Sequence, residues 1–251
     1  MSTAGRPGPS RGRVGRVLSG IAVAVGCALF LGGFAWGALV YKPYTVPTDS
    51  MTPTIGRGHR VLAQRIHGDQ VHRGDVVVFQ DTAWGVAPMV KRVVGVGGDV
   101  VACCDKSGRM TVNGQPIDEP YLQDQGPASP IGFSAKVPEG RLFLLGDHRA
   151  DSVDSRSHLS TGQGTVPRSA VTGRVEATAW PLGDWGMLDR PASFTALPGG
   201  TSHTGPLPGL AAAVVAGAAL ILGGAAYGPV ERLFRRRPAG ETAKKTAASH
   251  G

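Results

Sequence analysis

Two long apolar stretches without a charged residue constrain this chain more than any other feature. Residues Val17 to Tyr41 and Leu207 to Val230 lack Asp, Glu, Lys, Arg and His, and they span 25 and 24 residues. An α-helix needs roughly 20 apolar residues to cross the hydrocarbon core of a membrane. The sequence therefore predicts two transmembrane helices, at 17–41 and 207–230.

Each stretch also has an alternative interpretation. A cleavable signal peptide usually has an apolar core of about 7 to 15 residues before a small-x-small site, and Ala35-Trp36-Gly37 matches such a site weakly. The first stretch is longer than such a core, which favours a retained anchor. The second is rich in Ala and Gly and contains Pro208 and Pro229, so a buried core helix or a flexible tail is the alternative there.

The net charge of +8 lies at the two ends of the chain. Residues 1–16 and 231–251 hold ten of the 26 basic side chains and two of the 18 acidic ones, which leaves 16 of each sign between them. A neutral middle offers no basic face to the phosphates of a nucleic acid, so a nucleic-acid-binding protein is disfavoured. Basic residues beside spanning helices tend to stay in the cytoplasm. We therefore expect a multi-pass protein of the plasma membrane, with both basic tails cytoplasmic and residues 42–206 outside.

The segment between the apolar stretches has the pattern of an all-β domain. Short runs of alternating or β-branched apolar residues are separated by Gly, Asn, Asp and Pro, and Asn113-Gly114 is a strong hairpin signal. Strands are expected at 60–66, 75–79, 89–96, 99–104, 109–112, 141–145 and 170–180. The sequence predicts coiled antiparallel β-sheets over 42–190, an exposed loop at 123–138, and a linker at 191–206 that is rich in Ser, Thr, Gly and Pro.

Three cysteines are too few for a disulfide framework. Cys27 lies inside the first apolar stretch, whereas Cys103 and Cys104 are adjacent in the outer segment. A disulfide between neighbours is strained, although the outer side permits oxidation, and no second Cys/His pair at ligand spacing supports a metal site. The sequence leaves the redox state of Cys103 and Cys104 open.

A serine and a lysine are candidates for chemistry. Ser50 follows the first apolar stretch between Pro47 and Pro53, which favour an extended chain and a fixed turn. A serine hydroxyl is a weak nucleophile near neutral pH and needs a positioned base. Lys91 lies inside an apolar strand, where alternation separates its side chain from that of Arg92 and burial would lower its pKa. Taken singly, a loop serine and a surface lysine are the ordinary interpretations.

A dense polar segment follows the strand expected at 141–145. Such a segment after an apolar strand is typical of a hydrogen-bonded loop at a site. Asp154 and Arg156 could pair to hold this loop, and the Ser152 hydroxyl could orient an amine. A structural turn is the alternative.

Together these segments resemble the bacterial type I signal peptidases. Over about residues 41–181, four boxes occur in the family's order: Ser-Met-x-Pro-Thr from Ser50, Gly-Asp-Val-Val-Val-Phe from Gly74, Lys-Arg-Val-Val-Gly-x-x-Gly-Asp from Lys91, and Gly-Asp-x-Arg-x-x-Ser-x-Asp-Ser-Arg from Gly146. The resemblance implies a membrane-bound serine endopeptidase with a Ser-Lys dyad and an outer peptidase domain at 42–190. Its partners would be secretory preproteins, cleaved after a small-x-small motif, and the lipid bilayer, with no metal or organic cofactor.

The resemblance also implies roles for single residues. Ser50 would be the nucleophile and Lys91 the general base, and the Thr48 hydroxyl would join the Ser50 N–H in an oxyanion hole. Shallow substrate pockets would be lined by Tyr44, Val46, Met51, Ile55 and Val90. Core packing is the alternative for each of these pocket residues.

In the loop after residue 145, the resemblance makes Ser152 the residue that orients the lysine amine. Asp154 and Arg156 would be its supporting ion pair. The chain departs from the family's usual Asn, Asp-Asn and aromatic-rich ending at His148, Ala150-Asp151 and Ser157-His158-Leu159. We expect activity to be retained because the three supporting residues are present, and the departures leave the substrate range and the loop geometry open.

Two rival functions share parts of the pattern. A self-cleaving regulator can use a Ser-Lys dyad, but such proteins are normally soluble with a DNA-binding domain, which nothing in residues 1–41 resembles. A membrane-anchored β-rich binding module could keep the boxes as scaffold. Its function would be indifferent to the loss of Ser50 or Lys91.

Overall fold

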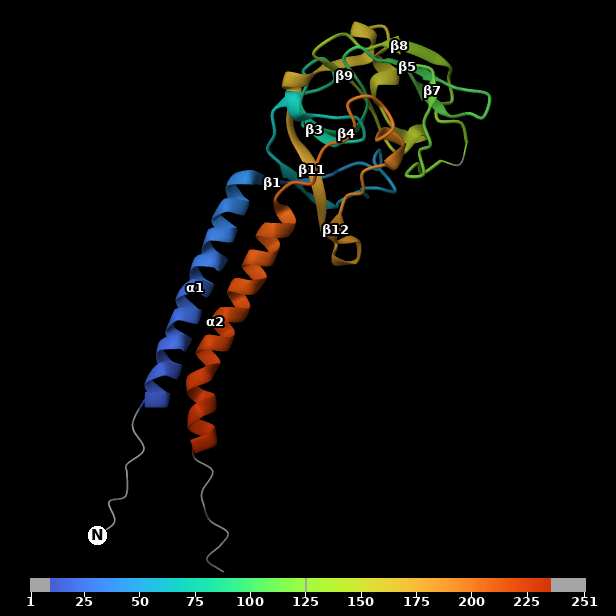
Figure 1. Ribbon diagram of the computed structural model, residues 1–251. Coiled ribbons are helices and arrows are strands. Elements are labelled where there is room, and N and C mark those ends of the chain that lie inside the picture. Colours follow the sequence, from blue (N-terminus) through green and yellow to red (C-terminus); the bar gives the residue numbers. More distant parts are fainter. Residues whose placement is uncertain (1–9, 125, 236–251) are drawn as a thin grey trace, which may run out of the picture. The chain divides into compact units, whose positions relative to one another are not determined.

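The computed structural model of the protein describes residues 10–124 and 126–235 (Figure 1). The basic tails expected at 1–16 and 231–251 lie mostly outside this range. The chain divides into two compact units. The helical unit contains the chain up to Gly37 and from Pro206 onward, and the β unit runs from Ala38 to Gly205.

Both apolar stretches form long helices, α1 (Ser10–Val40) and α2 (Leu207–Arg235). Their apolar runs, Val14–Val40 and Leu207–Pro229, have mean hydropathies of 2.2 and 2.1, and each is long and apolar enough to cross a membrane. Each helix coincides with one of the two stretches for which the sequence predicts a membrane span.

Small residues let the two helices approach closely inside the helical unit. A Cβ atom added at Gly26 would lie 2.8 Å from the carbonyl O of Gly217, and one added at Gly217 would lie 2.7 Å from the carbonyl O of Gly26. Gly33 faces Val214 and Gly224 faces Val23, so residue numbers fall along α2 as they rise along α1. The helices are therefore antiparallel, and backbone contact between them depends on glycine.

The β unit contains a large antiparallel sheet in the order β1-β2-β11-β3-β4-β9-β10, with β12 paired to β11. Its strands are β1 (Tyr41–Thr45), β2 (Arg60–Gln64), β3 (Val76–Phe79), β4 (Met89–Val96), β9 (Arg141–Leu145), β10 (Thr165–Pro167), β11 (Val171–Trp180) and β12 (Gly186–Met187). The longer strands coincide with apolar runs for which the sequence predicts strands. The first strand begins at the residue after α1 ends.

A second antiparallel sheet has the order β7-β6-β5-β8. Its strands are β5 (Val100–Cys103), β6 (Met110–Val112), β7 (Gln115–Pro116) and β8 (Phe133–Lys136). Figure 1 shows β5, β7 and β8 together on one side of the β unit. The exposed loop expected at 123–138 is wrong at its end, because Phe133–Lys136 pairs with β5 and Ala135 is buried in the core.

Residues 191–205 lie within the β unit, although the sequence marks 191–206 as a linker. Phe194 is fully buried and packs in the same cluster as Phe143 and Leu145. The Ser202 hydroxyl donates a hydrogen bond to the buried carboxylate of Asp75. These contacts fix the chain on the β unit almost to the start of α2.

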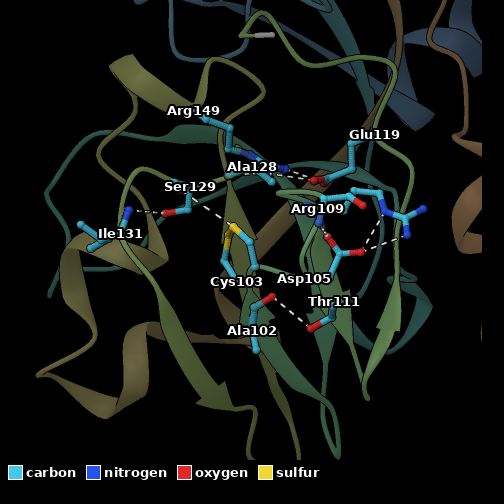
Figure 2. Close-up of a disulfide and its surroundings, with 12 residues drawn as sticks. Ala102, Cys103, Asp105, Arg109, Thr111, Glu119, Ala128, Ser129, Ile131 and Arg149 are labelled. Carbon is cyan, nitrogen blue, oxygen red and sulfur yellow. Dashed lines mark hydrogen bonds and ion pairs between the residues drawn. A yellow bond between two sulfur atoms is a disulfide. The ribbon is translucent and has the colours of Figure 1, made fainter. Parts of the chain in front are cut away.

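The structure joins Cys103 and Cys104 in a disulfide at the end of β5 (Figure 2). Cys103 is buried in the core, whereas Cys104 is exposed and its Sγ lies 3.9 Å from the carbonyl O of Ser129. The preceding carbonyl, that of Ala128, accepts a 2.8 Å hydrogen bond from Arg149 Nη1. The segment beside the disulfide is thereby connected to the loop that follows β9.

Candidate active site

An open cleft of about 440 Å³ lies in the β unit. Its lining residues are Pro47, Thr48, Asp49, Ser50, Arg57, Met89, Lys91, Asp151 and Val153. The lining brings together three of the segments that the sequence marks, although they are 40 to 100 residues apart in the chain. Two other hollows, of about 450 and 430 Å³, contain neither Ser50 nor Lys91.

The turn that carries Ser50 is anchored by buried apolar side chains on both sides. Val46, Met51 and Ile55 lie in one core cluster, and the Ile55 N–H donates a 2.9 Å hydrogen bond to the Met51 carbonyl. The Ser50 carbonyl accepts a 3.1 Å bond from the His148 N–H. This anchoring leaves the Ser50 side chain at the cleft with only 7% of its surface exposed.

Lys91 reaches the same point from β4. Residues 91 and 92 pair with Val77 and Val76 of β3, and alternation along the strand sends their side chains to opposite faces. Lys91 Nζ lies 2.5 Å from Ser50 Oγ, and the lysine side chain is buried. The structure therefore brings together the two residues on which the candidate chemistry depends.

Burial lowers the pKa of Lys91 from its ordinary 10.5 to about 8. The cause is desolvation, which disfavours the ammonium. The carboxylates of Asp154 and Asp147 act in the opposite direction because they stabilise the positive charge. A lysine with this pKa is neutral in a substantial fraction of molecules near pH 8, and it can then accept a proton.

On the other face of β4, Arg92 forms a buried ion pair. Its Nε and Nη2 donate to the two oxygens of Asp147 at 2.8 and 2.7 Å. The Thr54 hydroxyl also donates to Asp147, at 2.5 Å, and the guanidinium lies 4.0 Å from the ring centre of Tyr121. The bidentate pair connects β4 to the loop that follows β9, and so fixes that loop next to the cleft.

The same loop is held by a second buried pair. Asp154 accepts bonds from Arg156 Nε at 2.9 Å and Nη2 at 2.8 Å, and also from the Gly146 N–H at 3.0 Å. The expected pairing of Asp154 with Arg156 is therefore present. Gly146 is required here, because an added Cβ would lie 2.5 Å from the Ser50 carbonyl O and would overlap Ser152 Oγ.

The Ser152 hydroxyl lies against Gly146 and is buried. Within the described residues it makes no hydrogen bond, so the bond from Ser152 to the lysine amine that the resemblance implies is not formed here. Thr48 Oγ1 lies 3.3 Å from Ser50 Oγ. Within the same part of the chain, no hydrogen bond uses the Ser50 N–H.

The residues expected to line substrate pockets are absent from the cleft lining. Val46, Met51 and Ile55 are buried in the core that supports the Ser50 turn, whereas Tyr44 and Val90 are partly buried against the same cluster. An apolar residue close to a candidate nucleophile in the sequence can line a substrate pocket or fill the core, and only the packing of its side chain shows which of the two it does. Across residues 10–124 and 126–235, no group of three or more His, Cys, Asp or Glu side chains could hold a metal ion.

Comparison with known proteins identifies the family. The family model described as signal peptidase, peptidase S26, matches residues 16–180, about two thirds of the chain. The chain belongs to this signal peptidase family. It is therefore a serine peptidase, and its two helices fit a membrane location.

Curated relatives agree with membership of the signal peptidase family. A probable signal peptidase I of Mycobacterium leprae is 31% identical over 206 residues, covering 59% of this chain and 71% of the relative. Signal peptidase I U of Bacillus subtilis is 30% identical over 153 residues, covering 57% and 78%. A crystal structure of a signal peptidase I from Enterococcus faecalis is 25% identical, with a TM-score of 0.34, over 41% of this chain and 94% of that one.

Three further contacts of the loop after β9 in this signal peptidase were not found from the sequence. Arg149 is buried and pairs with Glu119 at 2.5 Å, and its Nε donates to the Gly146 carbonyl at 3.0 Å (Figure 2 shows Arg149 and Glu119). His158 stacks on Trp84 with ring centres 4.3 Å apart. Glu119 and Trp84 come from segments distant from Arg149 and His158, so no local pattern identifies these two pairs.

Proposed function

We propose that the protein is a signal peptidase I that cleaves secretory preproteins with a dyad of Ser50 and Lys91. The observation that carries the proposal is the 2.5 Å separation of Lys91 Nζ and Ser50 Oγ in a buried position. Desolvation makes the lysine a usable base, and the lysine is the group that a serine needs beside it.

The first half of the reaction forms an acyl-enzyme. Neutral Lys91 accepts the proton of Ser50 as Oγ attacks the carbonyl carbon of the scissile peptide bond. The resulting oxyanion accepts hydrogen bonds from the Ser50 N–H and the Thr48 hydroxyl. The Lys91 ammonium then gives its proton to the leaving amine, and the C–N bond breaks.

In the second half, water replaces the leaving amine. Lys91, again neutral, takes a proton from the water as it attacks the ester carbonyl, and then returns the proton to Ser50 Oγ. The ion pairs of Asp147 with Arg92 and of Asp154 with Arg156 hold the loop beside the dyad. Ser152 would orient the lysine amine after a rotation of its buried hydroxyl, which has no other partner in the described residues.

The substrate would bind as an extended chain along the cleft, with small residues at the first and third positions before the cut. Tyr44 and Val90, which retain partial exposure, are the expected pocket residues that remain accessible. Val46, Met51 and Ile55 would shape these pockets from beneath.

The basic tails orient the protein in this proposal. Both tails would lie in the cytoplasm, because Arg and Lys beside spanning helices stay on that side. Two spans then place the β unit outside, where exported preproteins emerge.

Preprotein cleavage by the purified full-length protein tests the proposed function. We expect cleavage after a small-x-small site, and its loss in both Ser50→Ala and Lys91→Arg, because a guanidinium cannot act as a base near neutral pH. Lys106→Arg, at an exposed lysine, is the matched control and should cleave normally. Undiminished cleavage by Lys91→Arg would refute the dyad.

A further inference from the structure

An exposed carboxylate shares the cleft with Ser50 and Lys91. Asp151 ends a short 3₁₀ turn, Arg149–Asp151, and lines the same cleft as the dyad. Its N–H donates a 3.1 Å bond to the His148 carbonyl, and the neighbouring Ala150 N–H donates a 3.0 Å bond to Asp124 Oδ2. The backbone at Asp151 is thus fixed at the cleft, whereas its side chain is exposed.

The charges that face Lys91 differ in whether they are paired. Asp147 is paired with Arg92 and Asp154 with Arg156, each through two hydrogen bonds, although both carboxylates still stabilise the Lys91 ammonium. Asp151 makes no side-chain hydrogen bond or ion pair within the described residues. Of the carboxylates at 147, 151 and 154, Asp151 is therefore the one without a cation partner in the described residues.

The other side of the cleft contributes both signs of charge. Asp49 and Arg57, from the segment that carries Ser50, also line the cleft and carry opposite charges. Burial lowers the pKa of Lys91 most, Asp154 and Asp147 raise it, Arg156 lowers it, and the Asp151 carboxylate raises it by a smaller amount. Because the cleft is open to solvent, water and salt should weaken the electrostatic interaction between Asp151 and Lys91.

We propose that Asp151 tunes the dyad by stabilising the charged form of Lys91, and thereby limits cleavage at neutral and acidic pH. The proposal rests on the proposed role of Lys91 as the base. Asp151 does not touch the reacting atoms, and it acts only through the lysine. Removing its charge should therefore increase activity below the pKa of Lys91.

A charge series at position 151 provides the test. We would measure kcat/KM against pH for wild type, Asp151→Asn and Asp151→Lys, with a preprotein uncharged around the cut. In Asp151→Asn, the acid limb of the profile, where kcat/KM rises with pH, should move to lower pH by about 0.3 to 1 pH unit. This variant should therefore cleave about two to ten times faster than wild type near pH 6.5. The Lys variant should shift the limb further, and the plateau above pH 9.5 should be the same for all three.

Salt and a remote charge provide the controls. In about 1 M NaCl, where the Debye length is about 3 Å, the three profiles should converge. Asp69→Asn removes one exposed carboxylate outside the cleft lining and should leave the profile unchanged.

Three results would overturn the tuning role: an unmoved acid limb in both variants at position 151, activity lowered at every pH, or a shift equal to that of Asp69→Asn. Each of these would leave the dyad intact. Wild-type protein that does not cleave, or that cleaves equally well as Ser50→Ala, would instead refute the proposed function.

Discussion

Replacing Lys91 by methionine should stabilise the protein at pH 7 while it abolishes cleavage. Methionine is unbranched, has a similar length and can fill the same buried space without a charge. In the wild type, folding below pH 8 requires an ammonium group to enter a site that is 5% exposed. The variant avoids this cost.

The size of the effect follows from the pKa of Lys91. The difference between the ordinary 10.5 and about 8 in the folded state corresponds to about 3 kcal/mol. About 1 kcal/mol is lost with the hydrogen bond to Ser50 Oγ. The net stabilisation is therefore about 2 kcal/mol, or roughly 4 to 8 °C in Tm for a protein of this size.

The pH dependence has a definite sign. Because the folded state holds the Lys91 proton more weakly than the unfolded state, this lysine lowers the free energy of unfolding fully below about pH 8, and less as the pH rises. The cost disappears above about pH 10.5. The stability advantage of Lys91→Met should therefore be constant up to pH 8 and decline from there to pH 10.5.

Thermal unfolding of the detergent-solubilised full chain at pH 7, 9 and 10.5 measures this advantage. Lys106→Met, at an exposed lysine, is the control and should change Tm little at any pH. A Lys91→Met protein that is less stable than wild type at pH 7, by an amount that does not vary with pH, would refute the desolvation argument.

Four further outcomes are expected. The kcat/KM of the wild type should rise about tenfold from pH 7 to pH 9, with half of the rise complete near pH 8, and a pH-independent rate would contradict a base with the pKa of Lys91. Gly146→Ala should reduce kcat/KM about a hundredfold or more in a protein that still folds by circular dichroism, because its Cβ displaces the Ser50 carbonyl. Gly217→Leu should lower the melting temperature of the helices, whereas Gly223→Leu, which faces open space, should not, and equal effects would argue against glycine-mediated packing. Protease added outside intact cells should leave a tag after residue 251 uncut, and digestion would exclude a second span.

Local patterns were sufficient for the strands around the site. Met89–Val96 and Arg141–Leu145 form strands with the expected bounds, because their apolar and β-branched runs are buried on both faces. Alternation along β4 also predicts that Lys91 and Arg92 point apart. Both properties depend on neighbours within a few residues, so the sequence contains them directly.

Features that depend on distant partners could not be predicted. Phe133–Lys136 reads as a polar loop, and only pairing with β5 and burial of Ala135 make it a strand. Likewise Met51 and Ile55 are apolar residues close to Ser50 in the sequence, and whether they line a pocket or fill a core depends on which side chains of β2 and β3 pack against them. Burial is a property of the assembled sheet, not of the segment.

The pairing of β3 with β4 has a consequence for how this chain can change over time. Val77 lies opposite Lys91 and Val76 lies opposite Arg92, so a slip of one residue that brings Arg92 opposite Val77 would place a guanidinium beside Ser50 and move Val93 to the position from which Arg92 now pairs with Asp147. The buried Asp147 would then lose its cation, and a permanent cation would lie where the proposed mechanism needs a proton acceptor. A single-residue insertion or deletion between Val76 and Arg92 that shifts this pairing should therefore both abolish cleavage and lower the free energy of unfolding, whereas insertions in loops away from the cleft should be tolerated.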